Sequence, residues 1–349
     1  MSDATPSNAR TGVVHQPASA NVSIESIVGV REKTLWQTLV ASQAFWVTIA
    51  LIVICVLMSI REPRFATEDN FYNITRNFAF IGIMALGLTA VIITGGIDLS
   101  VGSIMGLVAV AAGLTLEAGY PWYAAVLAGL AAGALAGVVN GILIAYVGLS
   151  SFVVTLGMLS AARSVAVVLS GNRMIYNFGP GGPSFKSIGS GSLLGIANPV
   201  WVLVILTAIF AVTLRMTTWG RHLLAVGGNE HAANLTGVPV KRVKLQAYVI
   251  SGLSAAVAAI LSVGWAGSAI NALGTGYELR AIASTVIGGA NLMGGEGSAF
   301  GAFIGAALLE VIRNSLLMAG VDSNWQGVFV GAFLILAVLL ERIRGKRRE

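Results

Sequence analysis

The stretch GGIDLSVG, residues 95–102, places a single carboxylate, that of Asp98, between two runs of almost entirely apolar residues. AFIGIMALGLTAVIIT (residues 79–94) precedes it, and SIMGLVAVAAGL (residues 103–114) follows it. Each run suits a helix inside a lipid bilayer, and the glycines between them favour a break in the helix. Backbone groups at such a break must find partners inside the protein, because lipid offers none. The stretch therefore predicts a helical membrane fold that contains a polar helix break.

Composition extends this prediction to the whole chain. Hydrophobic residues make up 56% of the sequence, the mean hydropathy is +0.83 and only 10% of residues are charged, whereas soluble domains carry about 25% charged residues. The fold class that follows is all-α, a polytopic membrane protein. The net charge of +6 comes from basic residues spread over several loops, which is typical of charges that flank membrane spans. It does not indicate a nucleic-acid partner.

A helix needs roughly 17 to 25 apolar residues to cross the hydrocarbon core, and by this measure the sequence predicts about ten transmembrane helices. An even number places both termini on one side. We expect a polar, disordered tail over residues 1–43, a transmembrane domain over 44–341 and a short basic tail over 342–349. The predicted spans are 44–60, 78–94, 101–116, 122–147, 152–169, 200–216, 247–263, 279–294, 300–318 and 325–340.

Basic residues near the span ends predict the orientation, because cytoplasmic loops are enriched in Lys and Arg. The C-terminal ERIRGKRRE, residues 341–349, and the loop over residues 217–246 are both basic. We therefore expect both termini and this loop in the cytoplasm. Arg61, Arg64 and Arg76 then fall on the outside, where neighbouring acidic residues accompany them.

Glycines at intervals of four predict where helices pack closely. Small residues spaced in this way let the backbone of a second helix approach. The stripe in the predicted span 122–147 consists of Gly129, Gly133, Gly137 and Gly141. We expect this span to pack tightly against a neighbouring helix.

Several kinds of chemistry are missing from the sequence. No G-x-x-x-x-G-K-[ST] motif is present, so the chain holds no nucleotide site of that type. The three histidines lack zinc-type spacing, and no nucleophilic catalytic set can be assembled within the membrane. Cys55 is the only cysteine, which excludes an internal disulfide. We therefore expect no enzyme activity, metal or cofactor, and infer that the protein moves a solute across the bilayer.

Charged residues within spans are costly, by roughly 2.5 to 3.5 kcal/mol each at a helix centre, and are usually kept for a reason. Asp98 has two interpretations: a cap that accepts N–H groups at the start of the next helix, or a proton- or ion-coupling carboxylate of a secondary transporter. Arg163 suits an ion pair, a snorkelling side chain or a polar path. Glu310 and Arg313, three residues apart, predict an intrahelical pair.

The loop GGNEHAANLTGVPVKRVKL, residues 227–245, encodes a short helix of its own. Asn229 is a good N-cap, Gly237 suits the left-handed residue that ends a helix, and Pro239 prevents its continuation. So short a helix is unstable by itself. It is therefore expected to dock either on a partner protein or on the cytoplasmic face of its own chain.

These two motifs together resemble one family. VIITGGIDLSVGSIMGL (residues 91–107) and GRHLLAVGGNEHAANLTGVPVKRVK (residues 220–244) are similar to the permeases of ABC transporters that import sugars of the ribose, xylose and arabinose type. NGILIAYVG, SFVVTLGML, TVIGGANLMGGEGSAFGAFIGAALL and NWQGVFVGAFLILAV resemble its other blocks in the same order. The similarity runs from about residue 70 to the C-terminus. Ser150 and Ser151 stand where the family often has proline before Phe152, and Asn314–Ser315 where it often has Asn-Gly.

The resemblance implies a permease of about ten helices with several partners. Two permease chains, identical or different, would form the pathway within the membrane lipids. Two cytoplasmic ATPase subunits would drive it, and an extracytoplasmic binding protein would deliver a pentose or hexose. This would explain the missing nucleotide motif. Two alternatives remain: an ABC permease for branched-chain amino acids, and an ion-coupled secondary transporter that uses Asp98.

The resemblance also implies roles for particular residues. The break would act as a hinge that contains Gly95, Gly96, Asp98, Ser100 and Gly102. Candidates for the translocation path are Asn140, Thr155, Asn291 and Asn314, although each could instead join helices through hydrogen bonds. The helix that couples to the ATPase would comprise Asn229, Glu230, His231, Ala232, Ala233, Asn234, Leu235, Thr236 and Gly237.

Overall fold

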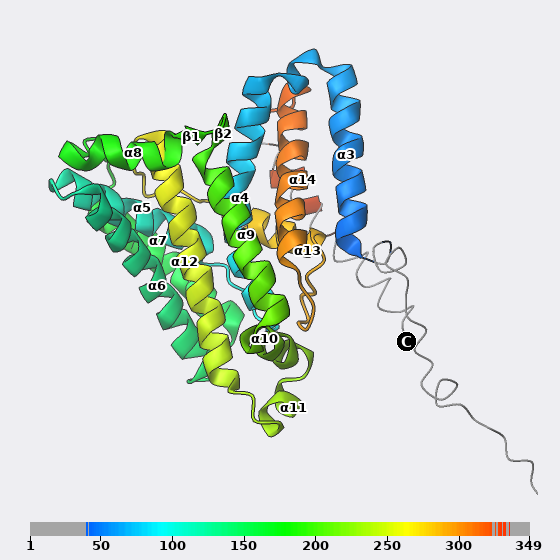
Figure 1. Cartoon of the computed structure of the whole chain (residues 1–349). Helices are drawn as coiled ribbons and strands as arrows, with labels where there is room; N and C mark the ends of the chain where they lie inside the picture. Colours follow the sequence, from blue (N-terminus) through cyan, green and yellow to red (C-terminus); the bar gives the residue numbers. More distant parts are fainter. Residues whose placement is uncertain are drawn as a thin grey trace, which may run out of the picture. The chain divides into compact units, whose positions relative to one another are not determined.

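The computed structural model describes residues 40, 42–322, 325, 327–329, 331–332 and 335. This part of the chain is a bundle of α-helices, with one small hairpin (Figure 1). The elements are α3 (Gln43–Arg61), η1 (Pro63–Ala66), α4 (Glu68–Ile93), α5 (Val101–Glu117), α6 (Trp122–Ala145), α7 (Ser151–Ser170), η2 (Gly179–Gly181), α8 (Gly182–Ser190), β1 (Ser192–Leu193), β2 (Ile196–Ala197), α9 (Asn198–Met216), α10 (Thr218–Gly228), α11 (Glu230–Leu235), α12 (Val240–Ala266), α13 (Tyr277–Ile287) and α14 (Ala299–Met318).

Seven of the described helices are long and apolar enough to cross a membrane, namely α3, α4, α6, α7, α9, α12 and α14. A further apolar helix, α5, has 17 residues and is largely buried by its neighbours. All eight coincide with predicted spans, although α4 begins ten residues before the predicted 78 and α12 begins at Val240 instead of 247. The all-α membrane fold is confirmed. The predicted tails and most of the tenth span, 325–340, lie outside the described residues.

The predicted span 279–294 is wrong. The helix in this region, α13, has only 11 residues, which makes it about 16 Å long, half of what a bilayer core requires. It ends at Ile287 because Gly288 and Gly289 follow, and Gly289 adopts φ +101°. Residues 288–298 then run without helix to the start of α14. The apolar character of this segment reflects burial inside the bundle and not a full crossing.

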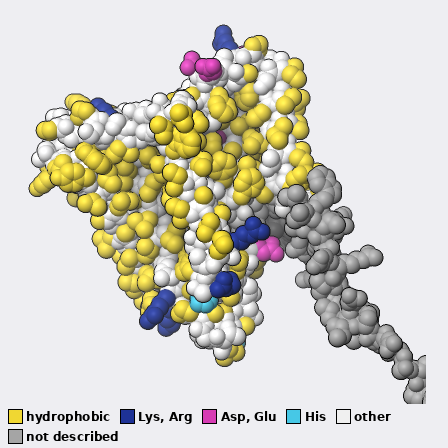
Figure 2. All heavy atoms as spheres, in the orientation of Figure 1, with side chains coloured by type: hydrophobic (Ala, Val, Ile, Leu, Met, Phe, Trp, Pro, Cys, Tyr) yellow, Lys and Arg dark blue, Asp and Glu magenta, His cyan; other side chains and the backbone are white. Residues whose placement is uncertain are grey.

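The core lies around α4, α5 and α12, whose side chains are mostly buried. In contrast, few residues of α3, α7 and α9 are buried, as is expected of helices that face lipid. Figure 2 shows hydrophobic side chains over the flank of the bundle, with the visible charged side chains toward its two ends. The end with α10 and α11 lies opposite the end with α8 and the β1–β2 hairpin (Figure 1).

The glycine stripe of α6 lies against α12. A Cβ atom on Gly133 would come within 2.5 Å of the Gly252 carbonyl oxygen, and one on Gly137 within 2.5 Å of the Tyr248 carbonyl oxygen. At these positions the two backbones touch with no side chain between them. Gly129 and Gly141 extend the same contact toward the two ends of α6.

Candidate functional site

The polar break between α4 and α5, residues 94–100, lies inside the bundle. Helix α4 ends at Ile93, and Gly95 continues in the left-handed region with φ +75°, which favours glycine. Gly96 passes so close to α12 that a Cβ atom there would lie 2.5 Å from the Tyr248 hydroxyl. The glycines of the motif therefore turn the chain and bring the break against α12.

Asp98 is fully buried at the centre of the break. Its Oδ1 atom accepts hydrogen bonds from the Ser100 N–H at 2.9 Å and the Ser100 hydroxyl at 2.5 Å. Its Oδ2 atom accepts one from the Ser251 hydroxyl of α12 at 2.8 Å. The expected cap is thus limited to the N–H of Ser100, the residue that precedes α5. The bond to α12 was not anticipated, and it makes the carboxylate a link between helices.

Two predicted path residues complete this network. The Asn140 side chain of α6 donates from Nδ2 to the Ser100 hydroxyl at 2.9 Å, and its Oδ1 atom is buried with no partner among the described residues. The Thr155 hydroxyl of α7 lies 3.4 Å from the Ile97 carbonyl oxygen and donates to the Ser151 carbonyl at 2.8 Å. Three helices, α6, α7 and α12, therefore meet the break through side-chain polar groups.

The other two predicted path residues take no part in this network. Asn291 belongs to the segment between α13 and α14, where its Oδ1 atom accepts the Met293 N–H at 2.8 Å. Asn314 forms a mutual amide pair with Asn70, at 2.8 and 3.2 Å, which joins α14 to the far end of α4. Asn70 is 23 positions from the end of α4, or about 35 Å along the helix. The structure therefore does not bring Asn314 to the break.

The predicted short helix is present as α11. The Asn229 Oδ1 atom accepts the Ala232 N–H at 2.9 Å, and Gly237 has φ +85° after the helix ends. One side of α11 lies on its own chain through the buried Ala233, whereas Leu235 is 75% exposed. Helix α10 precedes α11, and α12 follows it after four residues, so little of the 217–246 segment is irregular.

An ion pair joins α11 to α12. The Lys244 Nζ atom lies 2.6 Å from the Glu230 Oε2 atom. Lys244, Tyr248 and Ser251 are spaced i, i+4 and i+7 and thus occupy one face of α12. Tyr248 reaches the Ile97 carbonyl oxygen at 3.4 Å. A single helix face therefore connects the short helix to the break.

Backbone atoms alone form a second connection, which joins α10 and the segment before α14 to the end of α4. The Gly295 N–H donates to the Ile93 carbonyl at 2.9 Å. Gly227 of α10 lies so close to both that a Cβ atom there would overlap the Ile93 carbonyl oxygen. Sequence reasoning missed this joint, although the glycine pairs at 227–228 and 294–295 were its visible signs.

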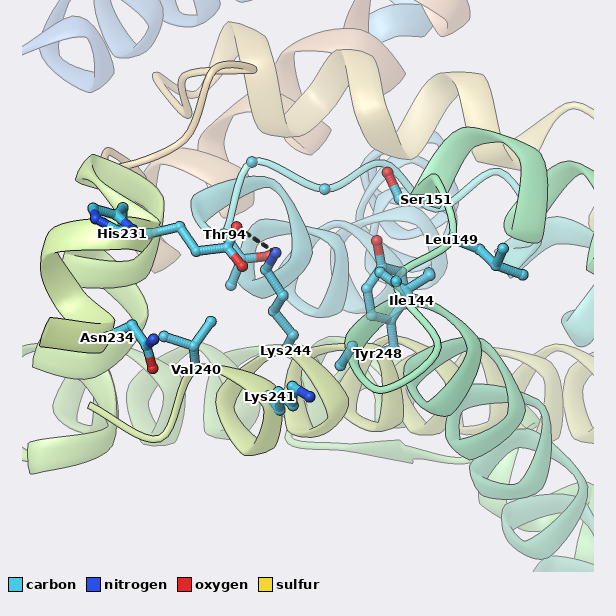
Figure 3. A pocket seen from close by; sticks show the side chains of 15 residues that line it. Thr94, Ile144, Leu149, Ser151, His231, Asn234, Val240, Lys241, Lys244 and Tyr248 are labelled. Atoms are coloured by element: carbon cyan, nitrogen blue, oxygen red, sulfur yellow. Dashed lines mark hydrogen bonds and ion pairs between the residues drawn. The ribbon is translucent and has the colours of Figure 1, made fainter. Parts of the chain in front are cut away.

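A cavity of about 630 Å³ separates the short helix from the break. Its walls come from Thr94–Gly96, the turn between α6 and α7, α11, and the first turns of α12. Figure 3 shows His231 and Asn234 of α11 on one side and Ser151 and Tyr248 on the other, with the ion pair marked between Lys244 and Glu230.

The other charged residues predicted within spans bind backbone carbonyls or pair with a neighbour on their own helix. Arg163 donates to the backbone carbonyls of Asn271, Leu273 and Gly102, the last two at 3.1 and 3.3 Å. It thereby fastens the loop before α13 to the start of α5. Glu310 and Arg313 form the predicted intrahelical pair. Within the described ranges, no group of three or more His, Cys, Asp or Glu side chains is placed to hold a metal ion.

Comparison with known proteins gives the family. Residues 70–338 match the protein-family model described as "Branched-chain amino acid transport system / permease component". The chain belongs to this permease family. The permease is accordingly a multi-pass membrane protein, in agreement with its long apolar helices.

Relatives of the permease match over most of their length. It is 38% identical to the ribose import permease protein RbsC of Escherichia coli K12, over 84% of this chain and 92% of that protein. It is 37% identical to the probable ABC transporter permease protein y4mJ of Sinorhizobium fredii, over 86% of this chain and 89% of that protein. With the autoinducer 2 import system permease protein LsrD of Photorhabdus temperata it shares 36% identity, over 87% and 92%.

A solved structure shares the fold of the permease. It is described as an inward-facing conformation of a metal-chelate type ABC transporter, and it matches with a TM-score of 0.50 and 16% identity. The match covers 85% of this chain and 98% of that chain. Identity at this level bears on the fold alone.

Proposed function

We propose that the chain is the membrane-spanning permease subunit of an ATP-driven, binding-protein-dependent importer of a monosaccharide. The observation that carries this proposal is the 38% identity to the ribose import permease of Escherichia coli across 92% of that protein. The ribose import permeases of Bacillus subtilis and Haemophilus influenzae, which are 36% and 34% identical to the chain, support it. The protein is a transport subunit, and ATP hydrolysis belongs to its partners, since the sequence has no nucleotide-binding motif.

The partners follow from this role. Two cytoplasmic ATPase subunits, an extracytoplasmic sugar-binding protein and a second permease chain complete the transporter in the bacterial inner membrane. The residues 229–237 form the coupling helix that docks on the ATPase. Exposed Leu235 supports this assignment, because an apolar side chain at the tip of a short helix suits a pocket on a partner.

The break segment serves as the hinge in this proposal. It is fastened to α12 by Asp98 and Tyr248, and α12 is fastened to the coupling helix by the Glu230–Lys244 pair. A displacement of α11 by the ATPase would therefore reach the break through a helix face that has two defined attachment points. Asn140 and Thr155 border the translocation path beside the hinge, and the segment that holds Asn291 lies next to it.

The test is uptake of labelled sugar in cells that express all subunits. Leu235→Asp should abolish uptake while the protein still inserts, because it places a charge in the contact with the ATPase. The matched control is Leu194→Asp, which makes the same change at an exposed leucine of the β1–β2 turn, at the opposite end of the bundle. Normal uptake by Leu235→Asp would contradict the coupling role.

The same assay separates the alternatives. Uptake of leucine, with no uptake of pentoses or hexoses, would show that the substrate is a branched-chain amino acid, as the name of the matching family suggests, and not a sugar. Accumulation of solute by liposomes that contain this chain alone, on a proton or sodium gradient, would favour ion coupling. We expect neither, and we expect the purified chain to have no ATPase activity.

A further inference from the structure

The cavity between the short helix and the break has the size and the lining of a ligand site. Its volume of about 630 Å³ lies within the range of roughly 300 to 1,000 Å³ that is typical of small-molecule sites. Polar groups from several elements converge on it, from the break, the α6–α7 turn, α11 and α12 (Figure 3). None of the roles proposed above requires such a cavity, because the coupling contacts run along α12.

Positive charge dominates the cavity. Lys241 and Lys244, three positions apart on α12, both line it, together with a single carboxylate, that of Glu230. Lys244 is already paired with Glu230 at 2.6 Å. Lys241 forms no ion pair with any carboxylate that the structure describes, and its Nζ atom lies 5.9 Å from the centroid of the Tyr146 ring. Lys241 is exposed, so its charge stands at the edge of the cavity with no carboxylate paired to it.

The opposite wall adds a second source of positive potential. Helix α7 begins at Ser151, which lines the cavity with Gly148 and Leu149. The first turn of α7 has no side-chain cap. Its N–H groups thus carry the partial positive charge of a helix N-terminus without an acceptor from a capping residue. The Ser151 hydroxyl accepts the Ile97 N–H at 3.4 Å and keeps its own proton for donation, and the side chains of His231 and Asn234 supply further hydrogen-bonding groups.

We propose that this cavity binds a phosphate group. A phosphate matches the combination of an unpaired lysine, an uncapped helix N-terminus and hydroxyl donors, because it offers several charged acceptor oxygens to all of them at once. A neutral sugar would make no use of the charge of Lys241, which is exposed at the edge of the cavity. The phosphate comes either from the headgroup of an anionic lipid or from a soluble phosphate ester. The cavity shares part of its wall with α11 and the Glu230–Lys244 pair, but binding of a phosphate there requires no sugar and is measured without transport.

The experiment uses the full-length chain in nanodiscs and has two arms. In the first, nanodiscs of phosphatidylcholine alone are titrated calorimetrically with inorganic phosphate and with ribose 5-phosphate. In the second, the chain is purified from mixed phosphatidylcholine and phosphatidylglycerol membranes, and the lipid that stays bound is measured by mass spectrometry. Binding in the first arm assigns a soluble phosphate ester, and selective retention of phosphatidylglycerol in the second assigns a lipid.

Three variants distinguish the site from general surface charge. In whichever arm shows binding, Lys241→Gln should weaken the affinity about tenfold, the effect of one lost charge-assisted hydrogen bond. Lys241→Arg should retain most of the affinity. Arg242→Gln is the matched control, because it removes the same charge from the next residue, which is exposed and does not line the cavity. It should bind as the unmodified chain does.

Two results would overturn the proposal. One is the absence of phosphate-ester binding together with equal retention of the two lipids. The other is an equal loss of binding in Lys241→Gln and Arg242→Gln, since this would reduce the effect to the net charge of the surface. Neither result bears on sugar uptake, so the proposed function is tested separately.

Discussion

The Ser251 hydroxyl donates a hydrogen bond of 2.8 Å to the Oδ2 atom of Asp98, a residue 153 positions earlier in the chain. The bond joins a helix break to the middle of the helix that begins after α11. Asp98 is fully buried, and the other partners of its carboxylate belong to Ser100. Among the described residues, this contact is therefore the only bond from the Asp98 carboxylate to α12, and it acts beside the Tyr248 hydroxyl, which reaches the Ile97 carbonyl oxygen at 3.4 Å.

Replacement of Ser251 by alanine should destabilise the protein. The change leaves one buried carboxylate oxygen without its partner, which costs about 1 to 3 kcal/mol of unfolding free energy. Thermal unfolding of the full-length chain in detergent would measure it. Ser254→Ala is the control, because that hydroxyl donates only to the Ser251 carbonyl of its own helix. Equal shifts in the two variants would show that the bond to Asp98 adds no stability.

Replacement of Gly133 by alanine should disturb the contact of α6 with α12. The new Cβ atom would lie 2.5 Å from the Gly252 carbonyl oxygen, so one backbone must move, at a cost of about 1 to 3 kcal/mol. The yield of monodisperse protein and its unfolding temperature would both fall. Gly157→Ala in α7, where a Cβ atom meets nothing within 4 Å, should be neutral or mildly stabilising. A neutral Gly133→Ala would contradict the close contact.

Glu310 and Glu117 each pair with an arginine, but their contributions to the stability of the fold should differ. Glu310 is 1% exposed beside Arg313, and removal of one partner from a buried pair costs about 3 kcal/mol or more. Glu310→Ala should therefore lower the unfolding temperature strongly. Glu117→Ala should change the unfolding temperature little, since Glu117 and Arg173 pair at the protein surface, where water and salt screen ion pairs. The reverse order of effects would refute the burial argument.

The sequence predicted the helices well where a simple local rule applies. Apolar runs of membrane length became helices, and the glycines of α6 face another helix, because both patterns reflect burial in a medium without water. The rule failed at α13, where residues 279–294 are apolar because the protein surrounds them. Hydropathy alone does not distinguish lipid from a protein interior.

The candidate site was predicted unevenly for similar reasons. Asn229 and Gly237 predicted the two ends of α11, because helix caps depend only on residues close in the sequence. Which side of α11 faces the chain could not be predicted, since a helix of six residues has too few turns for a periodic pattern. The bond from Asp98 to Ser251 depends on how distant segments pack, and no local pattern encodes it. Asn314 was grouped with Asn140 only because both are polar and lie within spans.

The joint of Gly227, Ile93 and Gly295 has a mechanical consequence. Side chains between two helices act as a compliant layer, because they can change rotamer and absorb small displacements. No such layer exists where α10 meets the end of α4, since backbone atoms touch directly. A shift of α10 by even an ångström would be transferred almost undiminished to the start of the break. The two glycine pairs thus leave this contact less room to absorb a displacement than a contact made through side chains.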